Sequence, residues 1–241
     1  MEHLALHRYA IVLAACTLFL LAAGASVTSN DAGLSVPDWP LSYGKVMPEM
    51  RGGVFYEHGH RMVATAVGFL TIILAAWLWF AERRNWLRRL GLIALAAVVA
   101  QGVLGGLTVI YLLPKGVSIA HACLAQLFFS TTVAIAVFTS PSWKRGPEIV
   151  YDSGTPSLRP LAVLAAASVF VQIALGAAYR HKALGLIPHV VGALGVTILV
   201  LLVAVFALTQ FPQHRVLRRT AYAVLGITLV QIGRASCRER V

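Results

Sequence analysis

The amino-acid sequence predicts an all-α polytopic membrane protein with about six full transmembrane helices and part of a seventh. Of its 241 residues, 59% are hydrophobic and only 12% are charged, and the mean hydropathy is +0.78. A soluble domain of this size needs more polar residues to cover its surface. Six apolar runs have about the 20 residues needed to cross a hydrocarbon core of roughly 30 Å; they are Tyr9–Val27, His60–Phe80, Leu87–Leu112, Val117–Thr139, Leu161–Tyr179 and Leu186–Thr209.

A seventh apolar run begins near Tyr222 and is expected to stop soon after Val230. The segment 231–241 that follows holds Arg234, Arg238 and Arg240, and each arginine costs a few kcal/mol inside a span. We therefore expect residues 231–241 to be a non-native tail, derived from a sequencing adaptor. The alternative is a basic cytoplasmic tail, which would leave the seventh run unfinished.

The basic residues indicate orientation. The formal net charge is +11, and the cations concentrate between runs two and three, four and five, and six and seven, for example at Arg83, Lys144 and Arg215. Cytoplasmic loops of membrane proteins carry such an excess. The pattern predicts an N-terminus in the cytoplasm and excludes nucleic acid as the partner of this charge.

Three histidines stand near the start of even-numbered runs: His60, His121 and His189. With the N-terminus inside, each of these runs enters from the outer face, so the three side chains share a depth near that face. An ionisable side chain in a span is costly and is usually kept for an ion, a proton path or a ligand. We expect them to ligate a metal-bearing cofactor. His58, next to His60, projects from another face and is given no role.

A short internal repeat precedes two of these histidines. Residues 101–106 and 172–177 share the pattern Gln-x-x-Leu-Gly-small, and His121 or His189 follows at the head of the next run. Small residues let helices approach closely, so helix packing alone could explain the glycines. The repeat favours a pseudo-symmetric bundle of two halves.

Glu57 and the three histidines suit a haem better than another kind of metal centre. Glu57 and His60 are three apart, so on a helix they share a face. A di-iron centre needs several Glu-x-x-His units, and only one is present. Cys16, Cys123 and Cys237 form no paired motif for a disulfide or a thiolate zinc site. Haem needs one or two imidazoles, an apolar pocket and cations for its propionates, for which Arg61 lies close by in sequence.

These strings together resemble the heme A synthase family over about residues 9–230. The resemblance rests on the motifs in order: Val-Thr-Ser-Asn-Asp-Ala-Gly-Leu at 27–34, Pro-Asp-Trp-Pro-Leu at 37–41, Glu-His-Gly-His-Arg at 57–61, Gln-Gly-Val-Leu-Gly-Gly-Leu-Thr-Val at 101–109, then His121, Arg180-His181 and Pro188-His189.

The resemblance implies two four-helix halves, of which the second is incomplete here. Residues 1–140 would form the half that binds substrate, 141–158 a cytoplasmic linker and 159–230 the half that holds the cofactor. It also implies an oxidoreductase of a bacterial cytoplasmic membrane that oxidises a ring methyl of heme O to the formyl group of heme A, with haem sites near the outer face and a role in terminal oxidase assembly.

Residue roles follow from the same resemblance. Glu57, His60 and His121 would be catalytic, with His60 and His121 also axial ligands of the substrate haem iron. His189 would be an axial ligand of a heme b cofactor, with Arg61, Arg180 and His181 as further haem-binding residues. The implied partners are heme O, heme O synthase, terminal oxidase subunits and a membrane quinone or other electron acceptor; the state of homo-oligomerisation is left open.

Two departures from the family pattern bear on these expectations. Many members carry a cysteine pair in the first outer loop, where this chain has Val36 and Ser42, so a disulfide or thiol relay there is excluded. The eighth helix, with the second ligand expected for heme b, is absent from the sequence, and the truncated chain is expected to be impaired.

Two other functions compete. A non-catalytic b-type cytochrome in quinol electron transfer would use the same histidine pairs without Glu57. A transporter would need broken helices at mid-membrane, but Pro114 and Pro188 stand at the ends of runs. Trp39 beside its prolines is equally well explained as an interfacial anchor.

Overall fold

The computed structural model describes residues 2–146, 148–152, 154 and 156–238, with side chains from residue 4 to residue 232 of these ranges. The described chain is helical and forms no strand apart from an isolated bridge between Ser42 and Lys45. Its helices are α1 (Glu2–Ser29), α2 (Gly53–Ala81), α3 (Asn85–Ile110), α4 (Lys115–Thr139), α5 (Pro141–Lys144), α6 (Leu158–Arg180), α7 (Leu186–Gln210) and α8 (Arg215–Arg238).

Six of these helices are long and apolar enough to cross a membrane: α1, from Leu4 onward, α2, α3, α4, α6 and α7. The all-α polytopic membrane fold is therefore confirmed. The chain divides into two compact units, Met1–Glu148 (unit 1) and Ile149–Val241 (unit 2), and each is described by itself.

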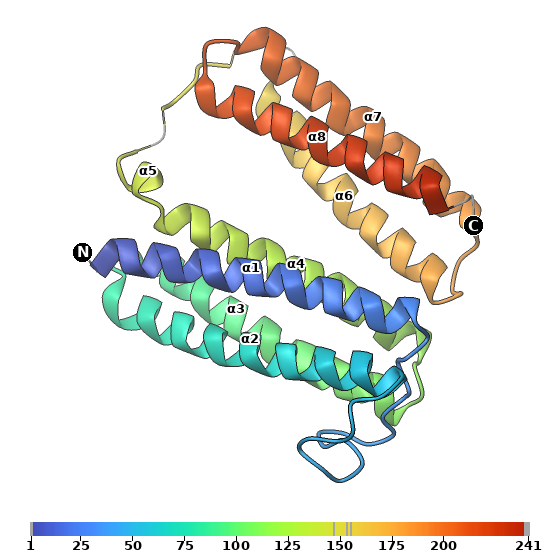
Figure 1. Cartoon of the computed structure of the whole chain (residues 1–241). Helices are drawn as coiled ribbons and strands as arrows, with labels where there is room; N and C mark the ends of the chain where they lie inside the picture. Colours follow the sequence, from blue (N-terminus) through green and yellow to red (C-terminus); the bar gives the residue numbers. More distant parts are fainter. Residues whose placement is uncertain (1, 147, 153, 155, 239–241) are drawn as a thin grey trace. The chain divides into compact units, whose positions relative to one another are not determined.

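Unit 1 is a closed ring of four long helices (Figure 1). Helix α1 contacts α2 and α4, and α3 contacts the same two helices from the other side. Fully buried leucines on three helices, Leu13, Leu74 and Leu87, meet Phe128 and Ile135 of α4 in one core. Large apolar residues such as Phe69 and Phe80 remain exposed on the outside, as expected for a surface that faces lipid.

Close approach of α2 and α3 depends on a glycine. A Cβ at Gly91 would lie 2.8 Å from Leu78 Cδ1 of α2. Small residues at helix interfaces bring backbones together where lipid offers no hydrophobic driving force for association.

The turn between α2 and α3 is organised by Glu82, whose side chain is buried. Its Oε1 accepts hydrogen bonds from the Arg83 and Arg84 backbone N–H groups, and Arg84 Nη2 donates to Oε2 at 2.8 Å. The side-chain hydrogen bond from Arg84 lowers the pKa of Glu82 from 4.5 to about 2. This carboxylate therefore caps the backbone N–H groups of the turn that leads into α3, an arrangement that we call the Glu82 cap, while the Glu82 backbone N–H donates to the Leu78 carbonyl at the end of α2.

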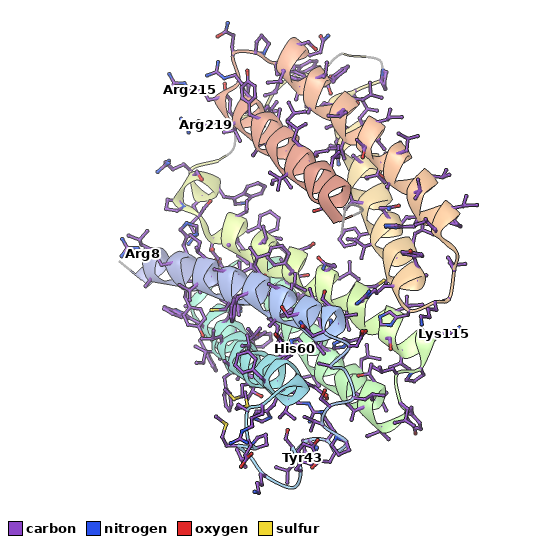
Figure 2. The ribbon with its side chains drawn as sticks, turned by 45° about the vertical axis from the view of Figure 1, so that its right-hand side comes forward. Arg8, Tyr43, His60, Lys115, Arg215 and Arg219 are labelled. Atoms are coloured by element: carbon purple, nitrogen blue, oxygen red, sulfur yellow. The ribbon has the colours of Figure 1, made fainter. Side chains whose placement is uncertain are left out.

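Unit 2 consists of α6, α7 and α8, with α7 in contact with both others. Its buried core is made of small residues, Ala204, Ala207 and Ala221, which Leu158 and Leu225 surround. Arg215 and Arg219 mark the first turns of α8 (Figure 2).

Helix α8 differs from the sequence prediction at both ends. It begins at Arg215 instead of near Tyr222, and it continues to Arg238 instead of stopping after Val230. Arginine, alanine and glutamine are good helix formers, so the backbone stays helical although Arg234 and Arg238 make the segment too polar for a span. The last three residues of the expected tail lie outside the described residues.

Helix α2 also begins earlier than predicted. It begins at Gly53, so His60 lies about two turns inside the helix instead of opening it. Glu57 and Arg61 are therefore both helical, one turn apart on the same face.

The Glu82 cap predicts that the stability of unit 1 depends on pH. Because the folded-state pKa is lowered, its stabilisation is fully present above pH 4.5 and is lost as the pH falls towards about 2. We expect Glu82→Gln to destabilise unit 1 by about 1–2 kcal/mol at pH 7, allowing for solvent screening. Thermal unfolding in detergent should show a lower melting temperature for the variant at pH 7, and the difference from the wild type should shrink between pH 4.5 and pH 2.

Glu49→Gln is the matched control for this experiment. Glu49 lies 3.6 Å from Arg51, and both side chains are at least 80% exposed, so its replacement should leave the melting temperature unchanged. Equal melting temperatures for Glu82→Gln and Glu49→Gln at pH 7 would contradict the role of the cap.

Candidate haem site

Glu57 connects the loop between α1 and α2 to the four-helix ring of unit 1. The carboxylate is buried, with 4% of the residue exposed. Its Oε2 accepts a hydrogen bond from the Val36 backbone N–H at 2.9 Å, and its Oε1 lies 2.6 Å from Arg61 Nη2. Both oxygens of the predicted catalytic carboxylate therefore have partners within the chain.

Arg61 extends this connection further along the loop. Its Nη1 donates to the backbone carbonyls of Asp38 and Leu41, at 2.8 and 3.0 Å. The Asp38 carboxylate in turn accepts hydrogen bonds from the Tyr43 and Gly44 N–H groups. These backbone bonds, that of Gly44 foremost, lower the pKa of Asp38. The loop is thus folded around one guanidinium.

His58 has a role that sequence reasoning missed. It is 6% exposed, and its Nδ1 lies 2.8 Å from Ser42 Oγ, which is also buried. Val36 and Ser42, the two loop positions singled out in the sequence, thus contact adjacent residues of α2, Glu57 and His58. A hydroxyl sixteen positions before a histidine gives no recognisable spacing, because a loop of irregular backbone brings the two together.

His60 lies between α1 and α2 at the end of unit 1 nearer the loop that carries Tyr43, away from Arg8 at the other end (Figure 2). Its ring packs against α1, where a Cβ at Gly24 would lie 3.0 Å from His60 Cε1, and it interacts with the Leu20 carbonyl. Its Nδ1 is buried and has no hydrogen-bond partner among the described residues. A buried ring nitrogen without a partner is unusual and suits a ligand.

His121 of α4 belongs to the same end of unit 1. It interacts electrostatically with His60, so the structure brings together two of the three predicted histidines. Its ring packs against α3, where a Cβ at Gly105 would lie 3.4 Å from His121 Cε1, and its backbone carbonyl accepts a hydrogen bond from Gln101 Nε2 at 2.9 Å.

Trp39 packs on the motif that holds His121. A Cβ at Gly106 would lie 2.7 Å from the indole ring, although the tryptophan is 44% exposed. The second small residue of the Gln-x-x-Leu-Gly-small pattern therefore makes room for a loop side chain. Trp39 ties the loop to α3, which complements the interfacial-anchor interpretation.

His189 of unit 2 has surroundings that match those of His121. Gln172 Nε2 lies 2.9 Å from the His189 backbone carbonyl and 2.9 Å from His189 Nδ1. A Cβ at Gly176 would lie 3.1 Å from His189 Cε1, and the Tyr179 ring stacks on the imidazole at 5.8 Å. Arg180 is exposed and His181 is half-buried at the C-terminal end of α6; burial, and then the charge of Arg180, lowers the pKa of His181.

A closed all-protein metal cage is not formed by the described residues, which contain no group of three or more His, Cys, Asp or Glu side chains able to hold a metal ion. Haem does not need one, because the macrocycle supplies four ligands and the protein only the axial ones.

Comparison with known proteins gives the family. The pattern of the family described as cytochrome oxidase assembly protein matches residues 49–188, more than half of the chain and including Glu57, His60 and His121. The chain belongs to this family. The resemblance to heme A synthase that the sequence motifs indicate is thereby confirmed.

Individual relatives agree with the family assignment. A heme A synthase of Symbiobacterium thermophilum is 32% identical over 182 residues, which cover 71% of this chain and 58% of that protein. One of Alkalihalophilus pseudofirmus is 26% identical and covers 95% of this chain and 84% of its own length. A third heme A synthase, from Shouchella clausii, is 29% identical, and the match covers 55% of this chain and 45% of the length of that protein. This chain thus spans little more than half the length of the first relative. No solved structure matches it.

The Arg61 contacts predict how strongly the loop between α1 and α2 is protected from hydrogen exchange. Arg61→Met would leave the buried Glu57 carboxylate without its counter-charge, at a cost of about 3–5 kcal/mol. We expect hydrogen exchange of the backbone amides at positions 36–44 to become at least tenfold faster, measured by mass spectrometry in detergent.

Arg51→Met serves as the control, because Arg51 pairs with Glu49 at 3.6 Å on an open surface. Its exchange at positions 36–44 should equal that of the wild type. Slow exchange in Arg61→Met would mean that Arg61 does not hold the loop.

Proposed function

We propose that this chain is a heme A synthase-type oxidoreductase that oxidises a ring methyl of heme O to the formyl group of heme A, in support of terminal oxidase assembly. The observation that carries the proposal is the pair of histidines on α2 and α4 of unit 1: they interact electrostatically, and the buried Nδ1 of His60 has no hydrogen-bond partner among the described residues. Membership of the cytochrome oxidase assembly family supports it.

His60 and His121 would bind the iron of the substrate heme O. Their helices face each other across the ring of unit 1, and both rings lie at the end that carries the loop. The residues present fit a haem through two imidazoles with apolar helices around them, whereas Arg61, the cation expected for a propionate, already pairs with Glu57 and the loop carbonyls.

Glu57 would act at the reacting methyl group. Converting a methyl to a formyl group takes up one water oxygen and releases four protons and four electrons, so a base and an electron acceptor are both needed. As one half of an ion pair with Arg61, Glu57 supplies a fixed carboxylate that can receive a proton or stabilise developing positive charge. The electrons would leave to a membrane quinone or another acceptor.

His189 would hold heme b in unit 2, where the bound cofactor supplies a one-electron carrier. The Nε2 group of Gln172 contacts both the ring and the backbone carbonyl of His189, and Tyr179 stacks on the ring. These contacts hold the ring and the backbone of His189 in place. Arg180 and His181 would serve the propionates.

The proposed setting is a bacterial cytoplasmic membrane with the N-terminus in the cytoplasm and the haem sites near the outer face. The support is the charge distribution. In unit 1, Arg8 lies at the end opposite the loop (Figure 2). Arg83 and Arg84 lie between the second and third spans, and Lys144 and Arg145 follow the fourth span, so all four stand on the side expected to be cytoplasmic. Heme O synthase and terminal oxidase subunits are the partners to expect.

The histidine assignment predicts the behaviour of haem binding. His60→Ala and His121→Ala should each weaken binding of heme O to the purified chain at least tenfold, because each variant would lose a residue proposed to hold the iron. Binding is measured by the Soret absorbance during titration in detergent. His7→Ala is the control, since His7 contacts the Ala136 carbonyl of α4 away from the site. Unchanged binding in both site variants would remove the haem assignment from unit 1.

The Glu57 assignment predicts a change of product. In cells that make heme O and lack their own heme A synthase, the wild type is the gene completed with an eighth helix, since the truncated chain is expected to be impaired. Glu57→Gln in that gene should abolish the formyl haem that the wild type produces, and heme O or a partly oxidised haem should accumulate. Extracted haems are identified by mass spectrometry, and Glu49→Gln is the control. Formyl haem in Glu57→Gln would contradict the catalytic role, and haem without any formyl product in the wild type would favour a b-type cytochrome.

A further inference from the structure

Each of the three site histidines packs against a glycine of the preceding helix in its unit. A Cβ at Gly24 of α1 would lie 3.0 Å from His60 Cε1, and one at Gly176 of α6 would lie 3.1 Å from His189 Cε1. At Gly105 of α3 the distance to His121 Cε1 would be 3.4 Å. In all three cases the nearest atom is the same ring carbon.

Two of these glycines share a second feature. Gln101 and Gln172 stand four positions before Gly105 and Gly176, so on a helix each pair lies on one face. Each amide donates to the backbone carbonyl of the same histidine that the glycine faces, at 2.9 Å in both units. The amide fixes the backbone of the histidine while the glycine leaves room for its ring.

The other helical glycines of the described residues face no imidazole: Gly91 and Gly106 face Leu78 and Trp39, and several face open space. A Cβ at Gly68, Gly102 or Gly195 would meet nothing within 4 Å. Glycine costs about 1 kcal/mol relative to alanine in a helix interior, so a glycine that faces an imidazole needs a different explanation from general helix packing. Gly102 is informative because it stands in α3 beside Gln101.

We propose that Gly24, Gly105 and Gly176 are positioning residues that set the plane and depth of the imidazole rings of His60, His121 and His189 for axial ligation of haem. We call each glycine, with its glutamine where one is present, an imidazole seat. The inference rests on the haem ligation proposed above and adds residues that touch neither iron nor substrate.

The effect of filling a seat follows from the distances. Contacts of 3.0–3.4 Å are tighter than ordinary contacts of a Cβ atom, so a methyl group there displaces the ring by a few tenths of an ångström. A displacement of that size uses up much of the roughly 0.5 Å within which a ligating group has to be held, and the closest contact uses up the most. Filling the Gly24 seat should therefore disturb the haem most and filling the Gly105 seat least.

The test is a hemin titration of the purified 241-residue chain in detergent. A His189→Ala background confines binding to unit 1, and Soret absorbance gives the affinity. Gly24→Ala should weaken binding about tenfold to hundredfold, as for other residues that orient ligands, and should shift the spectrum of the haem that binds. Gly105→Ala should weaken it severalfold. The controls Gly68→Ala and Gly102→Ala should stay within about twofold.

Unit 2 provides an independent second series. In a His60→Ala background, Gly176→Ala should lower hemin affinity and shift its spectrum, whereas Gly195→Ala should not. Alanine favours a helix, so the melting temperatures of the variants should not fall. This series decides the question if Gly24→Ala proves not to fold.

The outcomes separate the two proposals. If His60→Ala binds hemin in unit 1 as tightly as its parent, the haem assignment fails and the seats fail with it. Suppose instead that His60→Ala weakens binding, but that each seat variant behaves like its control, Gly24→Ala like Gly68→Ala and Gly176→Ala like Gly195→Ala, in affinity and spectrum. Then the haem assignment stands and the proposal about the seats is wrong. Loss of affinity in all four glycine variants alike would also overturn them.

Discussion

The ion pair between Glu57 and Arg61 determines how the loop end of unit 1 is built. One carboxylate oxygen receives the Val36 N–H and the other the Arg61 guanidinium, which then collects the carbonyls of Asp38 and Leu41. Buried backbone polar groups need partners, and a single ion pair on α2 binds three backbone groups of an irregular loop. His60 stands on α2 between Glu57 and Arg61 in sequence, so the pair connects loop shape with the proposed site.

Much of the fold was predictable because the membrane imposes strong rules. Apolar runs of about 20 residues identified the six spans, and the two-part organisation was suggested by the Gln-x-x-Leu-Gly repeat. Helix boundaries were less accurate: α2 begins at Gly53 and α8 extends from Arg215 to Arg238. Hydropathy reports where a segment is apolar, whereas a helix continues through polar residues as long as its backbone can.

The candidate site was predictable in part for the same reason. His60 and His121 stood out because imidazoles are rare in spans, and the structure brings them together. The contacts of Glu57, the buried His58–Ser42 pair and the glycines that face the rings could not be anticipated. They depend on how an irregular loop folds back and on how closely two helices approach, and neither is encoded in periodicity. The repeat did contain the signal, since its glutamine and glycine both contact the histidine that follows.

The contact between Ser42 and His58 gives the loop an attachment that no thiol chemistry can open. A hydroxyl and an imidazole keep their hydrogen bond in an oxidising or a reducing medium alike, and Val36 is held through its backbone. The shape of this loop in the present chain is therefore insensitive to the redox poise of the surrounding compartment. Dithiothreitol or diamide should leave it as it is.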